Sequence, residues 1–277
     1  MAVIPAAGLG TRLFPLSLAT PKELLPLGDL PAIHRVVVEA RDAGVQTVVL
    51  VISERKKSLL EYFHPSAELL KLVGAGAGSE SVREILSLSR DLEIVPVYQE
   101  QALGLGHAIS LASEVVGQSP FLVMLPDDIL EPNVSTELVD LFSATSDGVL
   151  ALRRVQKEDT SRYGIATVDG GSSPWKVSGA VEKPKQAPST LAIMGRYLLP
   201  EGAMSLLKSE DPSVLGEIQL TPVLDQIARE GRMSAIDVSP NRYYDLGTID
   251  GYRSANAILA MEDPATSDDI VRSMKDV

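Results

Sequence analysis

The sequence predicts an α/β protein with a mostly parallel central sheet, helices on both faces and an added smaller antiparallel section. Two observations lead to this fold class. Short runs rich in Val, Ile and Leu, such as Thr47–Ile52, alternate with helical patterns, and such runs are typical of strands buried on both faces. After Gly148 the chain changes to short strands separated by Gly, Pro and Ser, which is typical of antiparallel pairing.

The first half of the sequence predicts alternating strands and helices. Ala2–Pro5 is a short apolar strand that leads into a Gly-rich turn. A helix is expected from Pro31 to about Ala43, because proline suits the first helical turn and Gly44 suits the residue after the helix. The following elements are expected in this order: strand Thr47–Ile52, a flexible connection at Gly74–Ser79, strand Leu92–Tyr98, helix His107–Val116, strand Phe121–Leu125 and helix Ser135–Ala144.

The second half predicts four short strands and two helices. The strands are expected at Val149–Arg153, Ala166–Asp169, Val177–Glu182 and Leu191–Leu198, and the helices at Leu220–Glu230 and Ile249–Glu262. No linker is long enough to separate independent domains, so residues 1–262 are expected to form a single domain. Residues 263–277 are expected to form a loosely held acidic tail.

Composition excludes several classes of protein. The 277-residue chain has 25 Lys and Arg against 37 Asp and Glu, a net charge of −12, which argues against a general nucleic-acid binder. Without cysteine it has no disulfide or thiolate metal site, and its three histidines lack zinc-ligand spacing. No apolar run reaches the roughly 20 residues that cross a bilayer, and no basic flank precedes the first apolar stretch. These features predict a cytoplasmic protein that binds neither nucleic acid nor membrane.

The most informative motif is Ala6-Ala7-Gly8-Leu9-Gly10-Thr11-Arg12, directly after the first strand. Its glycines allow backbone N–H groups to approach an anion closely. Leu13 occupies the third glycine position of the dinucleotide fingerprint, and no Gly-Lys-Ser/Thr follows as in a P-loop. Two cations, Arg12 and Lys22, flank the turn and favour a polyphosphate ligand over a purely structural turn.

Gly-Leu-Gly-Thr-Arg, followed after eight residues by Pro-Lys-Glu-Leu-Leu-Pro, resembles the signature of the sugar-nucleotide pyrophosphorylase family. The resemblance continues in separate blocks to about Tyr252, and it is strongest to the bacterial members that act on UTP. It implies a Rossmann-like fold of the nucleotide-diphospho-sugar transferase type. It also implies a nucleotide-binding part at about 1–130 and a sugar-phosphate-binding part at about 131–252.

The nucleotide site has a second block, Gln99 followed by Gly104-Leu105-Gly106-His107-Ala108. An amide can pair with the donor and acceptor edge of uracil, and a helix start offers N–H groups. A surface loop with a helix cap is the alternative interpretation, and His107 is expected to be structural. The resemblance implies nucleotide contacts from Ala6, Ala7, Gly8, Gly10, Glu23, Gln99, Gly104 and Asp127.

Two carboxylates, Asp127 and Asp128, follow an apolar strand in the block Leu125-Pro126-Asp127-Asp128. Such positions suit Mg²⁺, although acids in turns and helix caps are also common there. The resemblance implies that Asp127 and Asp245 are the metal ligands. Ligand chemistry alone leaves Mn²⁺ open.

The sugar-phosphate site is expected from Tyr163-Gly164-Ile165 and Val181-Glu182-Lys183-Pro184. Glu182 can accept hydrogen bonds from hydroxyls and Lys183 suits a phosphate, although most adjacent Glu-Lys pairs are surface ion pairs. The block 216–221 is interpreted as an active-site wall and helix start. The resemblance implies sugar contacts from Asp128, Gly164, Glu182, Lys183 and Ile193.

The resemblance implies that UTP and glucose 1-phosphate are converted to UDP-glucose and pyrophosphate with Mg²⁺ by a homodimer or homotetramer. Arg12, Lys22 and Lys183 would be the catalytic cations. The attacking phosphate is already an anion, so no general base is required. The alternatives are glucose-1-phosphate thymidylyltransferase, a non-catalytic sugar-nucleotide-sensing subunit and a Rossmann-type dehydrogenase, which the missing third glycine disfavours.

Overall fold

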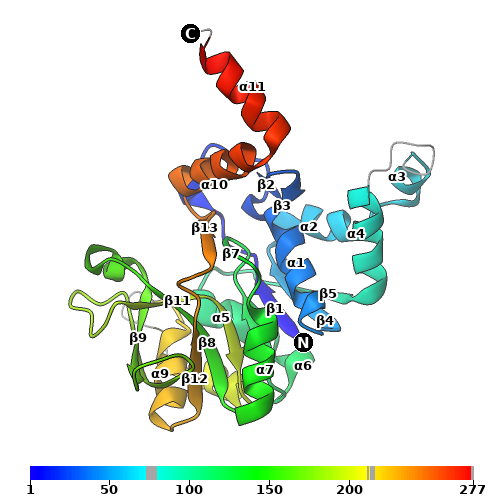
Figure 1. Cartoon of the computed structure of the whole chain (residues 1–277). Helices are drawn as coiled ribbons and strands as arrows, with labels where there is room; N and C mark the ends of the chain where they lie inside the picture. The colour runs from blue at the N-terminus through cyan, green and yellow to red at the C-terminus, as the bar shows by residue number, and fades with distance from the viewer. Residues whose placement is uncertain (73–79, 211, 213–215, 276–277) are drawn as a thin grey trace.

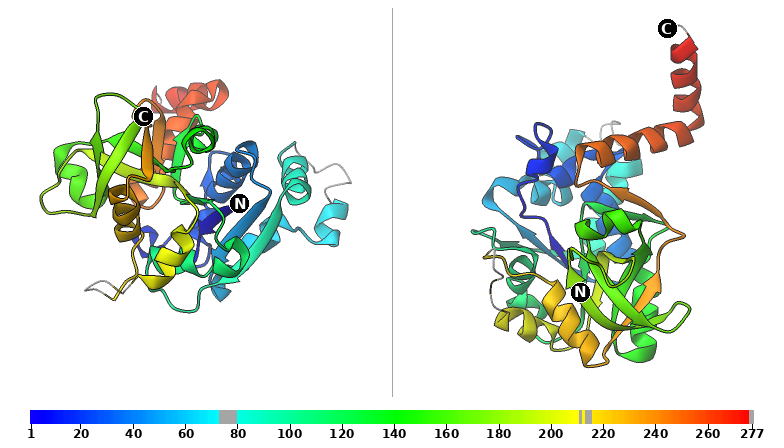
Figure 2. Two further views of the ribbon diagram at one scale, coloured as in Figure 1. Left: turned by 90° about the horizontal axis from the view of Figure 1, so that it is seen from below. Right: turned by 90° about the vertical axis from the view of Figure 1, so that its left-hand side faces the viewer.

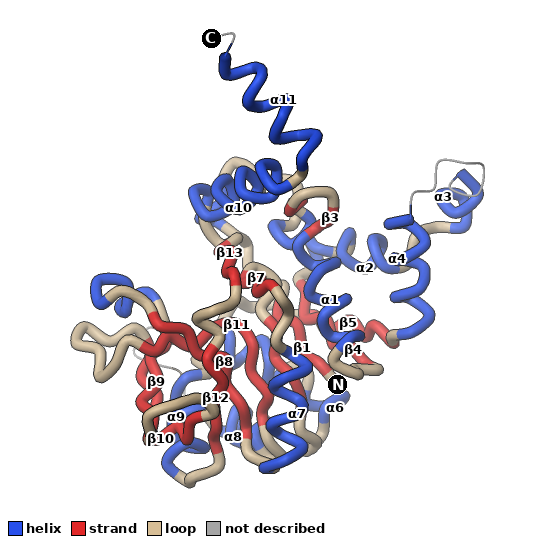
Figure 3. The backbone as a smooth tube through the Cα atoms, viewed as in Figure 1, coloured by secondary structure: helices blue, strands red, loops and turns tan. Residues whose placement is uncertain are grey.

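The computed structural model describes residues 1–72, 80–210, 212 and 216–275. Within these residues a nine-stranded sheet has the order β5-β4-β1-β6-β11-β8-β12-β10-β9 (Figures 1 and 3). Its strands are β1 (Ala2–Pro5), β4 (Thr47–Ile52), β5 (Glu93–Tyr98), β6 (Phe121–Met124), β8 (Gly148–Arg154), β9 (Gly164–Asp169), β10 (Trp175–Glu182), β11 (Leu191–Leu199) and β12 (Met233–Asp237).

The sheet confirms the predicted fold class. Strands β5, β4, β1 and β6 are parallel, whereas β11 is antiparallel to both β6 and β8. The antiparallel section therefore continues the same sheet, with β9 and β10 at its far edge. The chain passes from β1 to β4 and β5, and returns to β6 on the other side of β1. This arrangement creates a topological switch point between β1 and β6, where α/β sheets bind their ligands.

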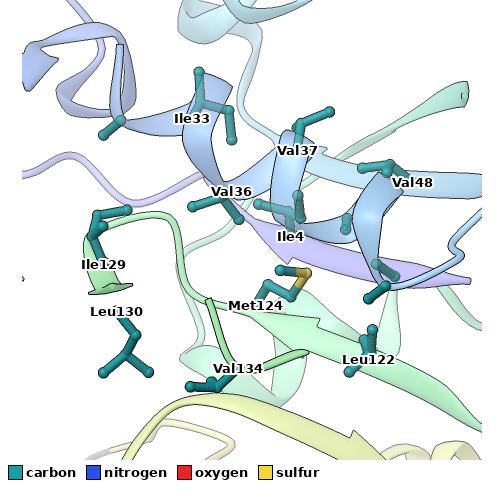
Figure 4. Packing of buried hydrophobic residues seen from close by; sticks show 14 of the residues in the cluster. Ile4, Ile33, Val36, Val37, Val48, Leu122, Met124, Ile129, Leu130 and Val134 are labelled. Atoms are coloured by element: carbon teal, nitrogen blue, oxygen red, sulfur yellow. The ribbon is translucent and has the colours of Figure 1, made fainter. Parts of the chain in front are cut away.

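Helices cover both faces of the sheet (Figure 2). One face carries α1 (Ala32–Asp42), α2 (Ser58–Phe63), α4 (Glu80–Asp91) and α7 (Ser135–Thr145), and the other carries α5 (Leu105–Ser110), α6 (Ser113–Val116), α8 (Ala203–Ser209) and α9 (Thr221–Arg229). Side chains of the central strands alternate between two hydrophobic clusters, so that Ile4 faces α1 and Val3 faces the opposite layer. Figure 4 shows Val36 and Val37 of α1 packed near Ile4 and Met124.

Two small ribbons lie outside the main sheet and were not predicted. β2 (Pro26–Leu27) pairs with β3 (Leu30–Pro31), and β7 (Asp128–Glu131) pairs with β13 (Arg242–Asp245). The second ribbon places Asp245 directly opposite Asp128. Because each of these strands has only two to four residues, none produces the apolar run that predicts a buried strand.

The C-terminal region is helical. Helix α10 (Ile249–Glu262) was predicted, and α11 (Pro264–Lys275) occupies the segment expected as a loosely held tail and projects from the body (Figure 1). Pro264 suits the first turn of that helix. Helix α3 (Ala67–Leu72) precedes the predicted connection Gly74–Ser79, which lies outside the described residues. In the described part of the chain, no helix has both the length and the apolar character needed to cross a membrane.

Candidate active site

The Gly-rich turn leaves β1 at the switch point. Ala6 N donates to Val51 O of β4 at 2.7 Å, so the turn begins level with the end of the neighbouring strand. Gly10 has φ 67°, a left-handed conformation that favours glycine. A Cβ atom on Gly10 would lie 3.2 Å from Cδ of Lys22, and none of the described residues comes within 4 Å of a Cβ on Gly8. The absence of a side chain at Gly10 therefore leaves room for the Lys22 side chain, and Gly8 is accessible to a ligand.

Lys22 lies in the short 3₁₀ helix η2 (Lys22–Leu24), and its ammonium forms an ion pair with the Asp127 carboxylate. Burial lowers the pKa of Lys22, but the carboxylates of Asp127 and Glu23 outweigh it and raise that pKa above its ordinary value. Burial by itself would raise the pKa of Asp127, but the Lys22 ammonium outweighs burial and lowers that pKa below its usual range. Both groups are therefore charged at neutral pH, and a predicted catalytic cation contacts a predicted metal ligand.

The carboxylates of Asp127 and Asp245 converge beside Gly247. A Cβ atom on Gly247 would lie 3.1 Å from Oδ1 of Asp245, 3.2 Å from Oδ2 of Asp127 and 2.9 Å from Nη2 of Arg12. The described residues contain no cluster of three His, Cys, Asp or Glu side chains that could hold a metal on protein ligands alone. Mg²⁺ commonly binds one or two carboxylates together with water and substrate phosphates. The two aspartates fit a divalent ion of this kind.

Arg162 is a cation at this site that the sequence analysis did not single out. Its Nη2 lies 3.5 Å from Oδ2 of Asp245, and its guanidinium lies 5.7 Å from the centre of the Tyr163 ring. The available signal was its place directly before the Tyr163-Gly164 motif. Asp127 and Asp245 are thus each paired with a cation.

Asp128 begins β7 and lies beside the candidate metal ligands. The Tyr243 hydroxyl donates to Oδ1 of Asp128 at 2.7 Å. A Cβ atom on Gly195 would lie only 2.5 Å from Oδ2, so glycine is required to leave room for this carboxylate. Burial and the neighbouring Asp127 raise the pKa of Asp128 to about 6, although the Tyr243 hydrogen bond acts in the opposite direction. In the folded protein Asp128 therefore binds a proton more readily than in the unfolded chain.

We expect Asp128→Asn to stabilise the protein relative to wild type by an amount that grows from pH about 4 to about 6. The folded pKa lies above the unfolded value, so ionisation of Asp128 lowers wild-type stability as the pH rises through this window. The difference should reach about 3 kcal/mol at neutral pH, because the pKa of Asp128 rises from 3.8 to about 6. Urea unfolding of both proteins at several pH values measures it. A difference that does not change with pH would contradict the assignment.

A cavity of about 510 Å³ opens beside these carboxylates. It is also lined by residues that the sequence analysis did not select, including Arg162, Tyr197 and Tyr243. Eight predicted site residues line it: Arg12, Asp127, Asp128, Gly164, Glu182, Lys183, Ile193 and Asp245. Residues predicted from four separate motifs therefore share one cavity.

Gly164, Glu182 and Lys183, which the sequence analysis assigned to the sugar phosphate, lie together in the lining of this cavity. Thr221, at the start of α9, donates to Oε2 of Glu182 at 2.5 Å. A Cβ atom on Gly164 would lie 3.3 Å from that oxygen, which leaves little room for a side chain at this position. Lys183 has φ 40°, an energetically costly conformation for a non-glycine residue that is typical of functional sites. Its Nζ lies 3.1 Å from Oε1 of Glu182.

A second cavity, of about 500 Å³, lies at the carboxyl ends of β4 and β5. Ala7, Ser53 and Gln99 are among its lining residues. Gln99 Nε2 lies 2.9 Å from Nδ1 of His107. Because an amide nitrogen only donates, His107 accepts this bond and fixes the orientation of the Gln99 amide. The Ser53 hydroxyl is buried and has no hydrogen-bond partner within the described ranges.

The helix start at Gly104 packs against the block 216–221. Gly104 has φ 102°, and a Cβ atom there would lie 2.5 Å from Ile218 O. Gly106 N donates to the same oxygen at 2.9 Å. Both glycines are therefore needed for close backbone contact. As predicted, the block contributes to the cavity wall, through Glu217, Gln219, Leu220 and Thr221.

Glu23 has a different setting from the other predicted nucleotide-binding residues. The Glu23 side chain is fully buried and pairs with buried Lys56. Through Lys56 it is linked to Ala6 O of the Gly-rich turn, and a direct contact between Glu23 and the nucleotide stays a prediction. The ligand contacts of the other site residues also stay predictions.

Comparisons with known proteins match this chain over most of its length. A family model described as nucleotidyl transferase matches residues 1–262. The UTP–glucose-1-phosphate uridylyltransferase of Staphylococcus epidermidis is 37% identical over 280 residues, covering 99% of this chain and 96% of the relative. A structure of UDP-glucose pyrophosphorylase complexed with UDP-glucose is 31% identical, with a TM-score of 0.84 and coverage of 94% of this chain and 98% of that chain. A UTP-bound UDP-glucose pyrophosphorylase of Acinetobacter baumannii is 30% identical, with a TM-score of 0.87 and coverage of 100% and 98%, respectively.

Proposed function

Because the chain belongs to the nucleotidyl transferase family, we propose that it converts UTP and glucose 1-phosphate to UDP-glucose and pyrophosphate. One observation carries the proposal: two cavities adjoin the Gly-rich turn, one containing the Gln99 amide and the other the cations and carboxylates. A nucleoside and a sugar phosphate placed in these cavities would meet at the phosphates. The similar uridylyltransferase and the UTP-bound and UDP-glucose-bound structures support this choice of substrates.

Gln99 reads the base in this proposal. His107 holds the amide nitrogen, so Oε1 of Gln99 is left as the acceptor for the N3–H group of uracil. The hydroxyl of Ser53 offers a further polar contact at the same cavity. The similar UTP-dependent proteins favour uracil over thymine as the base.

The phosphates lie between Arg12, Lys22 and Lys183. Arg12 holds the leaving pyrophosphate and Lys183 places the sugar phosphate, with Glu182 accepting hydrogen bonds from the hexose. Lys22 turns from Asp127 towards the α-phosphate and the attacking phosphate. The chain thereby aligns two anions whose mutual repulsion would otherwise separate them.

Asp127 and Asp245 hold Mg²⁺ in this proposal, and their convergence beside Gly247 is the structural support. When bound, the ion supplies positive charge to the phosphate oxygens and offsets the charge of the leaving pyrophosphate. A sugar-phosphate oxygen attacks the α-phosphorus in line, the bond to pyrophosphate breaks, and no general base is needed. His107 accordingly positions Gln99 and takes no part in proton transfer.

Assembly and location stay predictions. We expect a homodimer or homotetramer in the cytoplasm. Exposed apolar side chains on α10 and α11, namely Ile258, Met261, Val271 and Met274, are compatible with self-association.

The first assay measures pyrophosphate release from UTP, dTTP, ATP or CTP, each in the presence of glucose 1-phosphate and Mg²⁺. We expect the release to be fastest with UTP. EDTA should abolish the release with every nucleotide, because it removes the divalent ion that Asp127 and Asp245 are proposed to hold at the phosphates. Preference for dTTP would overturn the uracil assignment and leave the reaction class intact. A folded protein that binds UDP-glucose and releases no pyrophosphate would favour the sensing-subunit alternative.

A further inference from the structure

A buried ion pair connects three segments beneath the candidate active site. Lys56 ends the short 3₁₀ helix η3 (Glu54–Lys56) directly after β4, and only 5% of the residue is exposed. Its Nζ donates to Ala6 O at 2.7 Å and to both carboxylate oxygens of Glu23 at 2.8 Å. A lysine ammonium has three donors, and here three acceptors face it. Lys56 therefore joins the Gly-rich turn to helix η2 and to the end of β4.

This ion pair is not explained by stability alone. Burial raises the pKa of Glu23 and lowers that of Lys56, as expected for charges removed from water. Two apolar residues of similar size often stabilise a fold as well as a buried ion pair does. An ion pair, in contrast, fixes the direction of each group through its hydrogen bonds. A buried ion pair therefore also fixes the positions of the residues next to it.

The neighbour of Glu23 is Lys22, whose ammonium contacts Asp127. The Lys22 side chain also crosses Gly10, so its path depends on the spacing between the Gly-rich turn and η2. Lys56 sets that spacing, because it holds one residue of each segment. The other two residues of η3, Glu54 and Arg55, line the cavity that contains Gln99. Lys56 is thus placed between the nucleoside cavity and the catalytic cation.

We propose that Lys56 is a positioning residue that fixes the path of the Lys22 side chain past Gly10, so that the Lys22 ammonium can turn from Asp127 to the phosphates. The inference rests on the proposed function. Lys56 is buried behind the turn and Glu23, so it acts on the reaction through the position of Lys22. Its removal should lower kcat far more than it weakens UTP binding, because the Gln99 pocket remains in place.

The test compares wild type, Lys56→Met, Lys56→Met with Glu23→Gln, and the control Lys176→Met. Lys176 also pairs with an aspartate, Asp147, but it lies in β10 outside both cavities. We expect Lys56→Met to lower kcat by about thirtyfold or more, because an error of about 1 Å in alignment can cost about a hundredfold. The dissociation constant for UTP, measured by calorimetry, should change by less than about threefold. The control should keep the wild-type kcat.

The double variant separates positioning from folding. It removes both buried charges, so it should recover thermal stability relative to Lys56→Met without recovering kcat. Recovery of stability and kcat together, or near-normal kcat in Lys56→Met, would overturn the positioning role. Wild type that makes no UDP-glucose would overturn the proposed function and the inference with it. An active wild type with an unaffected Lys56→Met variant would overturn the inference alone.

Discussion

Lys22→Ala is expected to lower kcat at least a hundredfold while the protein stays folded. Lys22 is the cation that pairs with Asp127, and the pKa of Lys22 is raised, so it carries a full charge at neutral pH. In the proposed reaction that charge meets the phosphates as the new bond forms. Loss of one such contact removes about 3–4 kcal/mol of transition-state stabilisation, by analogy with a lost oxyanion donor. Steady-state kinetics of pyrophosphate release measures the effect.

Two further variants isolate the charge from the packing. Lys22→Met keeps methylene groups against Gly10 and removes only the ammonium, so it should be as inactive as Lys22→Ala. Lys57→Met is the matched control, because the Lys57 side chain is 54% exposed and pairs with Glu54. It should retain wild-type kcat. Near-normal turnover of well-folded Lys22→Met would exclude Lys22 from the catalytic cations.

Asp127→Ala should lower kcat as much as Lys22→Ala does, because it removes one of the two proposed metal ligands.

The sequence predicts the candidate site well wherever its signal is local. Residues such as Arg12 and Asp127 stand where an apolar strand ends and a turn begins, and the parallel strands bring these ends to one edge of the sheet. The selection of Gln99 depended on the resemblance, and the structure brings Gln99 to the same edge of the sheet, at the end of β5. Asp245 depended on the resemblance, because its strand has only four residues and pairs with β7 across the chain.

Contacts between distant buried charges could not be predicted from one sequence. Lys56 stands in a cluster of charged residues that reads as a solvated surface, yet it is buried against Glu23, 33 residues earlier. Arg196 stands in an apolar strand, and its partner Glu39 is 157 residues away on α1. Neither pair leaves a periodic pattern or a turn signal, so only the three-dimensional structure brings the partners together.

Arg196→Met is expected to cause the largest loss of stability among the substitutions considered. Arg196 is fully buried in β11, and its Nε and Nη2 donate to Oε2 of Glu39 at 3.0 and 2.8 Å. Its Nη1 donates to Leu125 O at 3.0 Å and so supports the segment that carries Asp127. Burial raises the pKa of Glu39, but Arg196 outweighs it and holds that pKa below its ordinary value. Without Arg196, Glu39 would be a buried charge lacking its counter-ion, which costs about 3–5 kcal/mol.

The pH dependence and a double variant distinguish this cause from a packing defect. Glu39 has a depressed pKa in the folded wild type, so its contribution is present above its unfolded pKa and is lost as the pH falls through the folded value. Arg196→Met removes that contribution, so its deficit in the free energy of unfolding, measured with urea, should shrink towards acidic pH.

The double variant Glu39→Leu with Arg196→Met should recover most of the stability at neutral pH, since no buried charge remains. Arg229→Met, which breaks an exposed pair with Asp225 on α9, should change stability by less than about 1 kcal/mol. A deficit in Arg196→Met that persists at acidic pH and in the double variant would show that lost packing, and not the unpaired Glu39, destabilises the protein.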